Sequence, residues 1–241
     1  MATTTARHLA RALRLATGAV LAAAVVVVPA SATISARDDF EPVSAPRAEQ
    51  LIRGATVQIL AFGCNLQRRE GTAVAVGPAR LLTNRHVVGA SRIVDVVADG
   101  YATTVADPPS VATAGDVATV TARGLDLPGL VLASADPLPG SPVRLAGYPS
   151  APPDQAGPGL VIENLKVVDY LPGTSVAQPW PVMRLSGGAR PGMSGGPVLD
   201  DRGRLAGVVF GNELPTGDAL AVPASALRRL VTSGAFVPGA C

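Results

Sequence analysis

Residues 186–211 read SGGARPGMSGGPVLDDRGRLAGVVFG, and within them Ser194 stands between glycines. Glycine on both sides lets the backbone turn tightly, exposes the hydroxyl and leaves amide hydrogens free to face an oxyanion. This pattern predicts a nucleophilic serine. A glycine-rich hairpin turn without chemistry is the alternative interpretation.

The same GxSxG pattern also fits the nucleophile elbow of an α/β-hydrolase, in which the histidine follows the serine along the chain. No histidine follows Ser194, and His8 lies in the N-terminal leader, so His86 is the only candidate base. An order with the aspartate first would need Asp38 or Asp39, both in an irregular lead segment. Only the order histidine, aspartate, serine remains.

Asp116, in AGDVATVTA, is the candidate that would orient the imidazole. The apolar alternation after it would bury its carboxylate near the interior of a β-barrel, beside the histidine. Four other aspartates between the histidine and the serine compete for this role: Asp95, Asp99, Asp107 and Asp126.

Short runs of β-branched and apolar residues, separated by Gly, Pro, Asp and Asn, fill the chain from Leu51 onward. This rhythm predicts an all-β sandwich or barrel. The runs are 56–61, 71–76, 93–98, 117–121, 143–147, 160–168, 205–210 and 220–222. A helix is predicted over 224–232, another could begin within 47–52, and the Pro- and Gly-rich segment 127–142 marks the predicted boundary between two β domains.

The first 32 residues have the three regions of a signal peptide: three arginines, an apolar run over 15–28, and small residues that predict cleavage after Ala32. A retained membrane anchor is the alternative, because residues 15–36 carry no charge and are long enough to span a bilayer. The following segment, 33–50, is predicted to be a linker or pro-segment. We therefore expect a secreted or cell-envelope protein.

Removal of the first 32 residues would change the net charge from +2 to −1. A chain with this charge is not expected to bind nucleic acid or, after cleavage, a membrane. The two cysteines, Cys64 and Cys241, do not form a CxxC motif, so a zinc site is not expected. An even number in an exported chain favours a disulfide between them. Two buried thiols are the alternative.

The motifs together resemble the bacterial trypsin-like peptidases related to the Deg-type proteases. They are GTAVAV and LLTNRHVV around His86, GDVATV around Asp116, GYP at 147–149, GMSGGPVLDDRGRLAGVVFG around Ser194, and ALAVPASALRRLV near the end. The likeness covers 51–241 and is strongest to the protease domain of actinobacterial periplasmic acid-resistance serine proteases. No PDZ domain is expected after the last helix.

This resemblance implies an all-β fold of two packed six-stranded antiparallel β-barrels, chymotrypsin-like, with a short C-terminal helix. The first barrel would span 51–130 and carry His86 and Asp116, and the second would span 131–241 and carry Ser194 and the helix. The implied activity is that of a serine endopeptidase acting on peptide or protein substrates, with no metal or organic cofactor.

The resemblance also assigns the oxyanion hole to the amides of Gly192 and Ser194, and the floor of the primary pocket to Gly188. One wall is expected from three consecutive residues, Val209, Phe210 and Gly211. A pocket without an acid at its floor is expected to prefer small or medium aliphatic side chains rather than Arg or Lys. Met193 departs from the family, because trypsin-like enzymes carry there an aspartate that pairs with a newly freed N-terminus.

Two rival functions remain open on the same fold. A catalytically silent, exported binding module would result if Met193 left the oxyanion loop malformed, and an esterase would share the whole triad. The sequence does not reveal the physiological substrate or the oligomeric state.

Overall fold

The computed structural model describes residues 41–98, 107–152, 155, 157–173 and 178–239, and the backbone of 101–104. The predicted signal peptide, residues 33–40 of the predicted linker, Asp99 and Cys241 lie outside this part of the chain.

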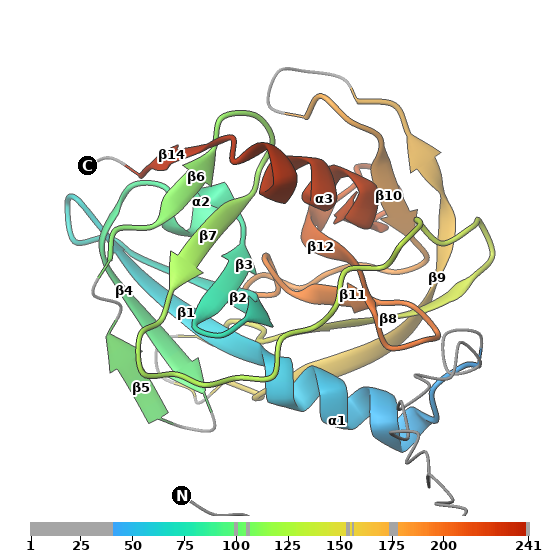
Figure 1. The fold of residues 1–241 in the computed structure, drawn as a ribbon, viewed down its shortest axis with the longest axis horizontal. Helices are drawn as coiled ribbons and strands as arrows, with labels where there is room; N and C mark the ends of the chain where they lie inside the picture. Colours follow the sequence, from blue (N-terminus) through green and yellow to red (C-terminus); the bar gives the residue numbers. More distant parts are fainter. Residues whose placement is uncertain are drawn as a thin grey trace, which may run out of the picture. The chain divides into compact units, whose positions relative to one another are not determined.

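Seven strands from the first half of the chain and one from its end form a sheet in the order β14-β6-β7-β3-β2-β1-β4-β5, with antiparallel pairs throughout (Figure 1). Its strands are β1 (Thr56–Gly63), β2 (Arg68–Gly77), β3 (Arg80–Thr83), β4 (Ser91–Ala98), β5 (Tyr101–Thr104), β6 (Ser110–Ala112), β7 (Ala118–Thr121) and β14 (Phe236–Pro238). The C-terminal strand β14 therefore returns to the first sheet and pairs with β6.

The second half forms a closed antiparallel barrel in the order β10-β13-β12-β11-β8-β9. Its strands are β8 (Pro142–Gly147), β9 (Val161–Leu171), β10 (Val182–Leu185), β11 (Pro197–Leu199), β12 (Leu205–Asn212) and β13 (Ala219–Pro223). Closure leaves this barrel without the unpaired strand edges that an open sheet has.

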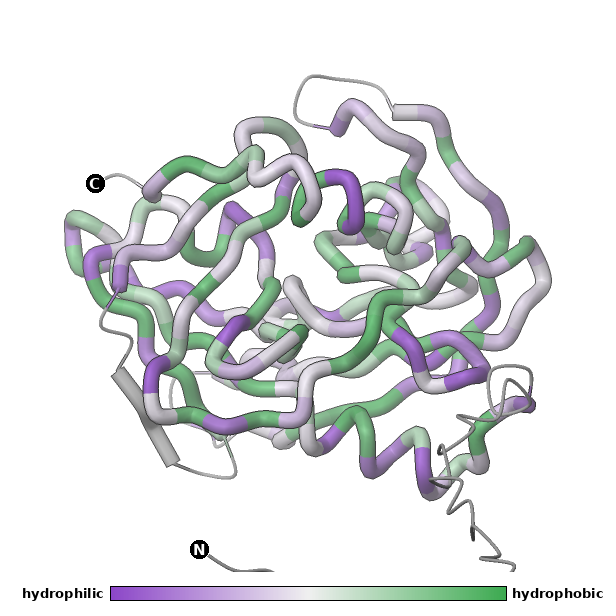
Figure 2. Tube along the Cα trace, in the orientation of Figure 1, coloured by the Kyte–Doolittle hydropathy of each residue, from purple (hydrophilic) through white to green (hydrophobic). Residues whose placement is uncertain are grey.

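Three helices accompany the strands in the described part of the chain: α1 (Ala45–Ala55), α2 (Arg85–Val88) and α3 (Ala224–Ser233). In α1, hydrophobic and hydrophilic residues alternate (Figure 2), and Ala48, Ile52 and Ala55 form its buried stripe. The amide of Val43 also donates to the carbonyl of Asp201 at 2.8 Å. The segment 33–50 was expected to be a linker or pro-segment, and from Val43 onward it packs and bonds with the folded body, which a free linker would not do. Helix α1 covers the range 47–52 in which a helix was expected to begin.

Buried residues form two clusters. One lies between the first sheet and the outer face of the barrel, with residues such as Ile59, Leu82, Val208 and Leu227. The other lies inside the barrel and includes Met193 and Val209. The consecutive residues Val208 and Val209 thus point to opposite sides of β12, as expected for a strand.

The all-β, chymotrypsin-like prediction is confirmed, and each of the eight predicted strand runs overlaps a strand. The second barrel has the six strands expected, whereas the first is an eight-stranded sheet. The predicted domain 131–241 needs a correction at its end, because β14 pairs with the first sheet. Within the described residues, no helix combines the length and apolar character needed to cross a membrane.

Cys64 is exposed in the turn between β1 and β2, with its sulfur 3.5 Å from the carbonyl oxygen of Ala90. Because Cys241 lies outside the described residues, its pairing with Cys64 stays a prediction. The chain does approach this turn near its end. A Cβ at Gly239 would lie 3.1 Å from the carbonyl oxygen of Gly89, next to Ala90.

Candidate active site

His86 lies in α2, the single helical turn that follows β3. The next two residues, Val87 and Val88, are buried in the core between the sheet and the barrel, which anchors the turn. The imidazole points away from that core, and the side chain is 50% exposed. A half-exposed imidazole is thus carried by a short helix that two buried valines anchor in the apolar core.

Asp116 receives two hydrogen bonds from His86. Its Oδ2 lies 2.6 Å from the imidazole Nδ1, and its Oδ1 accepts from the backbone N–H at 2.9 Å. Since a carboxylate only accepts hydrogen bonds, Nδ1 must carry a proton, which leaves Nε2 to serve as the base when the ring is neutral. The carboxylate therefore fixes both the orientation and the tautomer of the imidazole.

The buried side chain of Asn84 supports this pair, since its Nδ2 donates to the main-chain carbonyl of Asp116 at 2.8 Å. On the other side, Gly115 has a φ of 79° and lies against the indole of Trp180, where a Cβ would come within 2.5 Å of the ring. Sequence reasoning missed Asn84. Its position two residues before the histidine, in LLTNRHVV, was the available signal.

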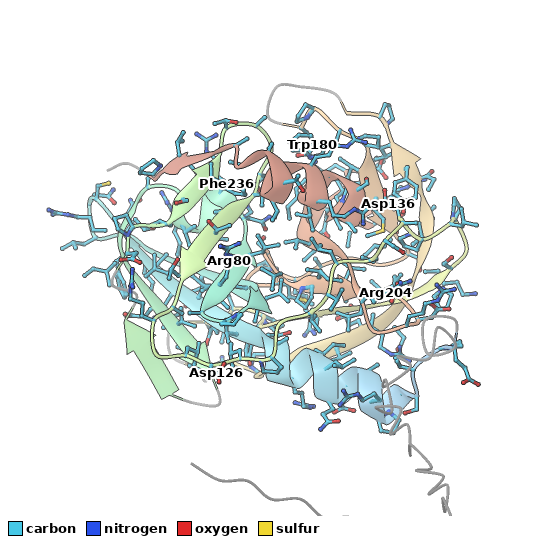
Figure 3. All side chains as sticks on the ribbon, viewed as in Figure 1. Arg80, Asp126, Asp136, Trp180, Arg204 and Phe236 are labelled. Carbon is cyan, nitrogen blue, oxygen red and sulfur yellow. The ribbon has the colours of Figure 1, made fainter. Side chains whose placement is uncertain are left out.

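None of the competing aspartates that the structure describes bonds to His86. Asp107 accepts from the guanidinium of Arg123 at 2.7 and 3.1 Å, and Asp95 lies in β4 opposite Thr104. Asp126 lies at the far end of the first sheet from α2 (Figures 1 and 3).

Ser194 is partly buried in the loop before β11. The loop turns at Gly192, with φ of 88°, and at Gly195, with φ of 90°. A Cβ at Gly195 would collide with the carbonyl oxygen of Thr72, so this position requires glycine. The amides of Gly192 and Ser194 donate to no group within the described residues and remain free to face an oxyanion.

The first sheet brings the histidine and serine segments together at Gly71 of β2. A Cβ on this glycine would lie 2.6 Å from a methyl of Val87, beside His86, and 3.2 Å from the carbonyl oxygen of Ser194. No hydrogen bond joins Ser194 Oγ to the imidazole among the bonds of the described residues. Such bonds are often long in ligand-free enzymes and tighten when substrate binds.

Met193 is the residue at which the sequence departs from the aspartate of trypsin-like enzymes. Its side chain is fully buried inside the barrel, and its sulfur accepts from the amide of Arg190 at 3.4 Å. Gly147 makes room for it, because a Cβ there would lie 2.9 Å from the Cβ of Met193. Apolar packing thus anchors the loop in place of an ion pair.

A hollow of about 1240 Å³ opens beside His86, and Phe210 lines it together with Val111, Gly115 and Gln178. The side chain of Val209 is fully buried inside the barrel and does not line this hollow, so its assignment to the wall of the primary pocket stays a prediction. The α-carbon of Gly211 borders open space. Of the three predicted wall residues, only Phe210 lines this hollow. Neither Gly188 nor Ser194 lines it, so the hollow is distinct from the predicted primary pocket.

Gly188, the predicted pocket floor, packs against the hairpin between β12 and β13, where a Cβ would lie 2.8 Å from the carbonyl oxygen of Gly217. Asn212, at the end of β12, joins this hairpin to Ala189, the residue after Gly188. Its Oδ1 accepts from the amide of Ala189 at 2.7 Å, and its Nδ2 donates to the carbonyl of Ala189 at 2.8 Å. Sequence reasoning missed this pair of hydrogen bonds, since an Asn at a strand end has no distinctive signal.

Three acidic residues of the barrel, two of them in the hairpin that Gly188 contacts, surround the guanidinium of Arg184. Arg184 bonds to Asp169 at 2.6 and 2.9 Å and to Glu213 at 2.8 Å, and Asp218 lies 3.9 Å away. The hydrogen bonds from Asp169 and Glu213 raise the pKa of the Arg184 guanidinium. These carboxylates are therefore engaged by Arg184.

Comparison with known proteins supplies the family. Serine protease Rv3671c of Mycobacterium tuberculosis is 35% identical over 186 residues, which are 71% of this chain and 45% of that protein. The chain thus spans less than half the length of this curated relative. The active form of the Rv3671c protease superposes with a TM-score of 0.69 at 26% identity, covering 83% of this chain and 92% of that chain.

A serine endoprotease from Yersinia pestis shares the fold, with a TM-score of 0.64 at 18% identity over 80% of this chain and 67% of that chain. The protein-family model described as a trypsin-like peptidase domain matches residues 71–208, more than half of the 241 residues. The chain therefore belongs to the family of trypsin-like peptidase domains.

Proposed function

We propose that this protein is an exported serine endopeptidase whose catalytic triad is His86, Asp116 and Ser194. The observation that carries the proposal is the pair of hydrogen bonds from His86 to both carboxylate oxygens of Asp116, at 2.6 and 2.9 Å. A surface histidine without a catalytic role has no need of a carboxylate that fixes its tautomer.

In the proposed mechanism, Nε2 of neutral His86 removes the proton from Ser194 Oγ as that oxygen bonds to the carbonyl carbon of a peptide. The amides of Gly192 and Ser194 donate to the resulting oxyanion, which is worth about 3 kcal/mol per donor. The C–N bond then breaks, and the imidazolium gives its proton to the leaving amine. Water, activated by the same imidazole, hydrolyses the acyl-enzyme and restores the serine.

The substrate class follows from the family and from the pocket. Gly188 offers no charge at the predicted floor, and the acids around it are engaged by Arg184. We therefore propose peptides and proteins with a small or medium aliphatic residue before the scissile bond. A peptide library would test this, and strong selection for Arg or Lys would contradict it.

Export is proposed from the N-terminal sequence alone, with cleavage after Ala32. The mature protein would then act outside the cytoplasm, in the cell envelope or beyond. N-terminal sequencing of the exported protein should find Thr33 first. A chain that retains its leader would support the anchor interpretation instead.

A fluorophosphonate probe tests the enzyme proposal directly. Wild-type protein should be labelled at Ser194, and Ser194→Ala and His86→Ala should each lower kcat on the order of 10⁶-fold, with no further loss in the double variant. Comparing ester with peptide substrates separates an esterase from a peptidase. The missing hydrogen bond between Ser194 and His86 keeps a catalytically silent binding module as the second candidate, and absence of labelling would favour it.

A further inference from the structure

Thr72, a completely buried residue of β2, uses every polar atom in hydrogen bonds. Its amide donates to the carbonyl of Ser194 at 2.8 Å. Its hydroxyl donates to the carbonyl of Gly192 at 2.8 Å and accepts from the amide of Tyr148 at 2.9 Å. Its own carbonyl accepts from the hydroxyl of Thr83 at 2.7 Å. A residue of the first sheet thus forms hydrogen bonds with two carbonyls of the loop that carries Ser194.

These bonds belong to a series that holds four consecutive peptide groups of the serine loop. Pro191 O accepts from Ser150 N at 2.8 Å, Gly192 O from Thr72 Oγ1 at 2.8 Å, Met193 O from Gly196 N at 2.9 Å, and Ser194 O from Thr72 N at 2.8 Å. Because a peptide group is planar, holding a carbonyl also orients the following amide. The series therefore fixes the two amides that face the oxyanion.

Of the four bonds, only the one from the Thr72 hydroxyl comes from a side chain. It holds the peptide group between Gly192 and Met193, which lies between the two free amides. Gly192 has a φ of 88°, and glycine without a Cβ turns easily to other conformations. The amide of this peptide group is also held, since Met193 N donates to Arg190 O at 3.0 Å. Without the hydroxyl, the Gly192 carbonyl would be buried without its partner, and a shift of this peptide group would misalign the two free amides.

We propose that Thr72 is a positioning residue for the oxyanion hole: its hydroxyl holds the Gly192 carbonyl so that the amides of Gly192 and Ser194 converge on the developing negative charge. This inference rests on the proposed serine endopeptidase function. Thr72 itself touches no substrate atom. It supplies the rigidity that a buried ion pair would otherwise give to this loop, in a chain whose Met193 can form none.

The decisive variant is Thr72→Val, which replaces the hydroxyl by a methyl group of similar size. We expect kcat to fall between about 10- and 100-fold, because a buried carbonyl and amide lose their partner and the oxyanion loses alignment. KM should stay within about threefold, since the oxyanion hole acts in the transition state rather than in the bound ground state. Thr72→Ser keeps the hydroxyl and should restore kcat to within about threefold of wild type.

A matched control exists on the neighbouring strand. Thr56 in β1 is also buried, 2% exposed, and its Oγ1 has no hydrogen-bond partner among the described residues. Thr56→Val makes the same chemical change without breaking a bond, so kcat and KM should match wild type. Melting curves of all variants ensure that rates are compared where each protein is folded. Thr72→Ala, which avoids pressing a methyl group against the Gly192 carbonyl, serves if Thr72→Val does not fold.

The outcomes distinguish a failure of this proposal from a failure of the serine endopeptidase proposal on which it rests. Wild-type protein with neither turnover nor probe labelling overturns the endopeptidase proposal and the positioning role together. Active wild type combined with Thr72→Val or Thr72→Ala at undiminished kcat overturns the positioning role alone. So does a Thr72→Ser variant that loses as much kcat as Thr72→Val, because the hydroxyl would then have no part in the effect.

Discussion

On the first sheet, His86 and Asp116 are held by side-chain hydrogen bonds, with Asn84 behind them. On the barrel, Ser194 sits in a loop held by main-chain bonds, by positive-φ glycines and by the buried Met193. Polar side chains thus build one half of the candidate site, whereas main-chain bonds, apolar packing and the one side-chain bond from Thr72 hold the other. Substitutions of the anchoring residues should therefore act differently in the two halves: loss of Asp116 should mainly lower turnover, whereas loss of the apolar anchor Met193 should mainly lower stability.

The largest expected effect is on turnover in the histidine half. Asp116→Asn keeps the shape of the side chain, but its amide would donate to Nδ1 and turn the imidazole to the wrong tautomer. We expect kcat to fall by about 10⁴-fold with a nearly unchanged melting temperature. Steady-state kinetics and a melting curve would measure both. Asp107→Asn, at the carboxylate that binds Arg123, is the control and should keep full activity. A tenth or more of wild-type activity in Asp116→Asn would remove this residue from the triad.

The corresponding change in the serine half should act on stability. Met193→Asp would restore the acid of the trypsin-like pattern, but inside an apolar cluster. Because a carboxylate buried among apolar side chains loses its hydration, we expect the free energy of unfolding to fall by about 4 kcal/mol. Met193→Leu, which conserves volume, should cost less than about 1.5 kcal/mol. Urea denaturation would distinguish them, and an aspartate variant as stable as wild type would show that the loop does not depend on apolar packing.

This contrast also explains what the sequence could predict. The order of His86, Asp116 and Ser194 eliminated other folds because polar side chains with fixed roles leave recognisable motifs. The strands were predictable because β-branched and apolar runs alternate with turn residues. Contacts made by main-chain atoms leave no such trace, so the pairing of β14 with β6 was missed. Helix α1 was assigned largely to a linker, since its buried stripe consists of small residues and one isoleucine whose partners are known only from the fold.

The same limit applies within the candidate site. Thr72 in a run such as GTAVAV indicates a strand, because threonine favours β-structure whether or not its hydroxyl has a partner. Val209 was assigned to the pocket wall from its place in the sequence, which does not reveal that its side chain is buried inside the barrel, because consecutive side chains of a strand point to opposite faces. Burial and hydrogen-bond partners, rather than residue type, separate these roles.

A smaller effect is expected at the C-terminus, which joins the two halves. The first sheet receives β14 from the end of the barrel half, and Gly239 lies close to Gly89 near the turn that carries Cys64. If Cys64 and Cys241 are bonded, Cys64→Ser should lower the free energy of unfolding by about 3 kcal/mol. The melting temperature should fall by about 5–10 °C, with little change in turnover below the transition. Mass spectrometry of unreduced peptides tests the bond, and two freely alkylated thiols in the native exported protein would exclude it.

The smallest effect should come from the support behind the His86–Asp116 pair. Asn84 is buried, and only its Nδ2 is used, donating to the main-chain carbonyl of Asp116, while its Oδ1 has no partner within the described residues. Asn84→Ala should therefore lose one hydrogen bond, which costs about 1–2 kcal/mol of stability. Looser support of Asp116 should lower kcat about tenfold without raising KM, because the bond orients the base and touches no substrate.

Asn65→Ala is the control for Asn84→Ala. Asn65 is exposed and accepts a hydrogen bond from the nearby amide of Gln67 at 3.3 Å, so its loss should leave kcat unchanged. Kinetics and melting curves of both variants decide the matter. If Asn84→Ala loses stability but keeps the wild-type kcat, the two bonds between Asp116 and His86 are sufficient by themselves to orient the imidazole. The first half of the site would then depend on fewer side chains than the structure suggests.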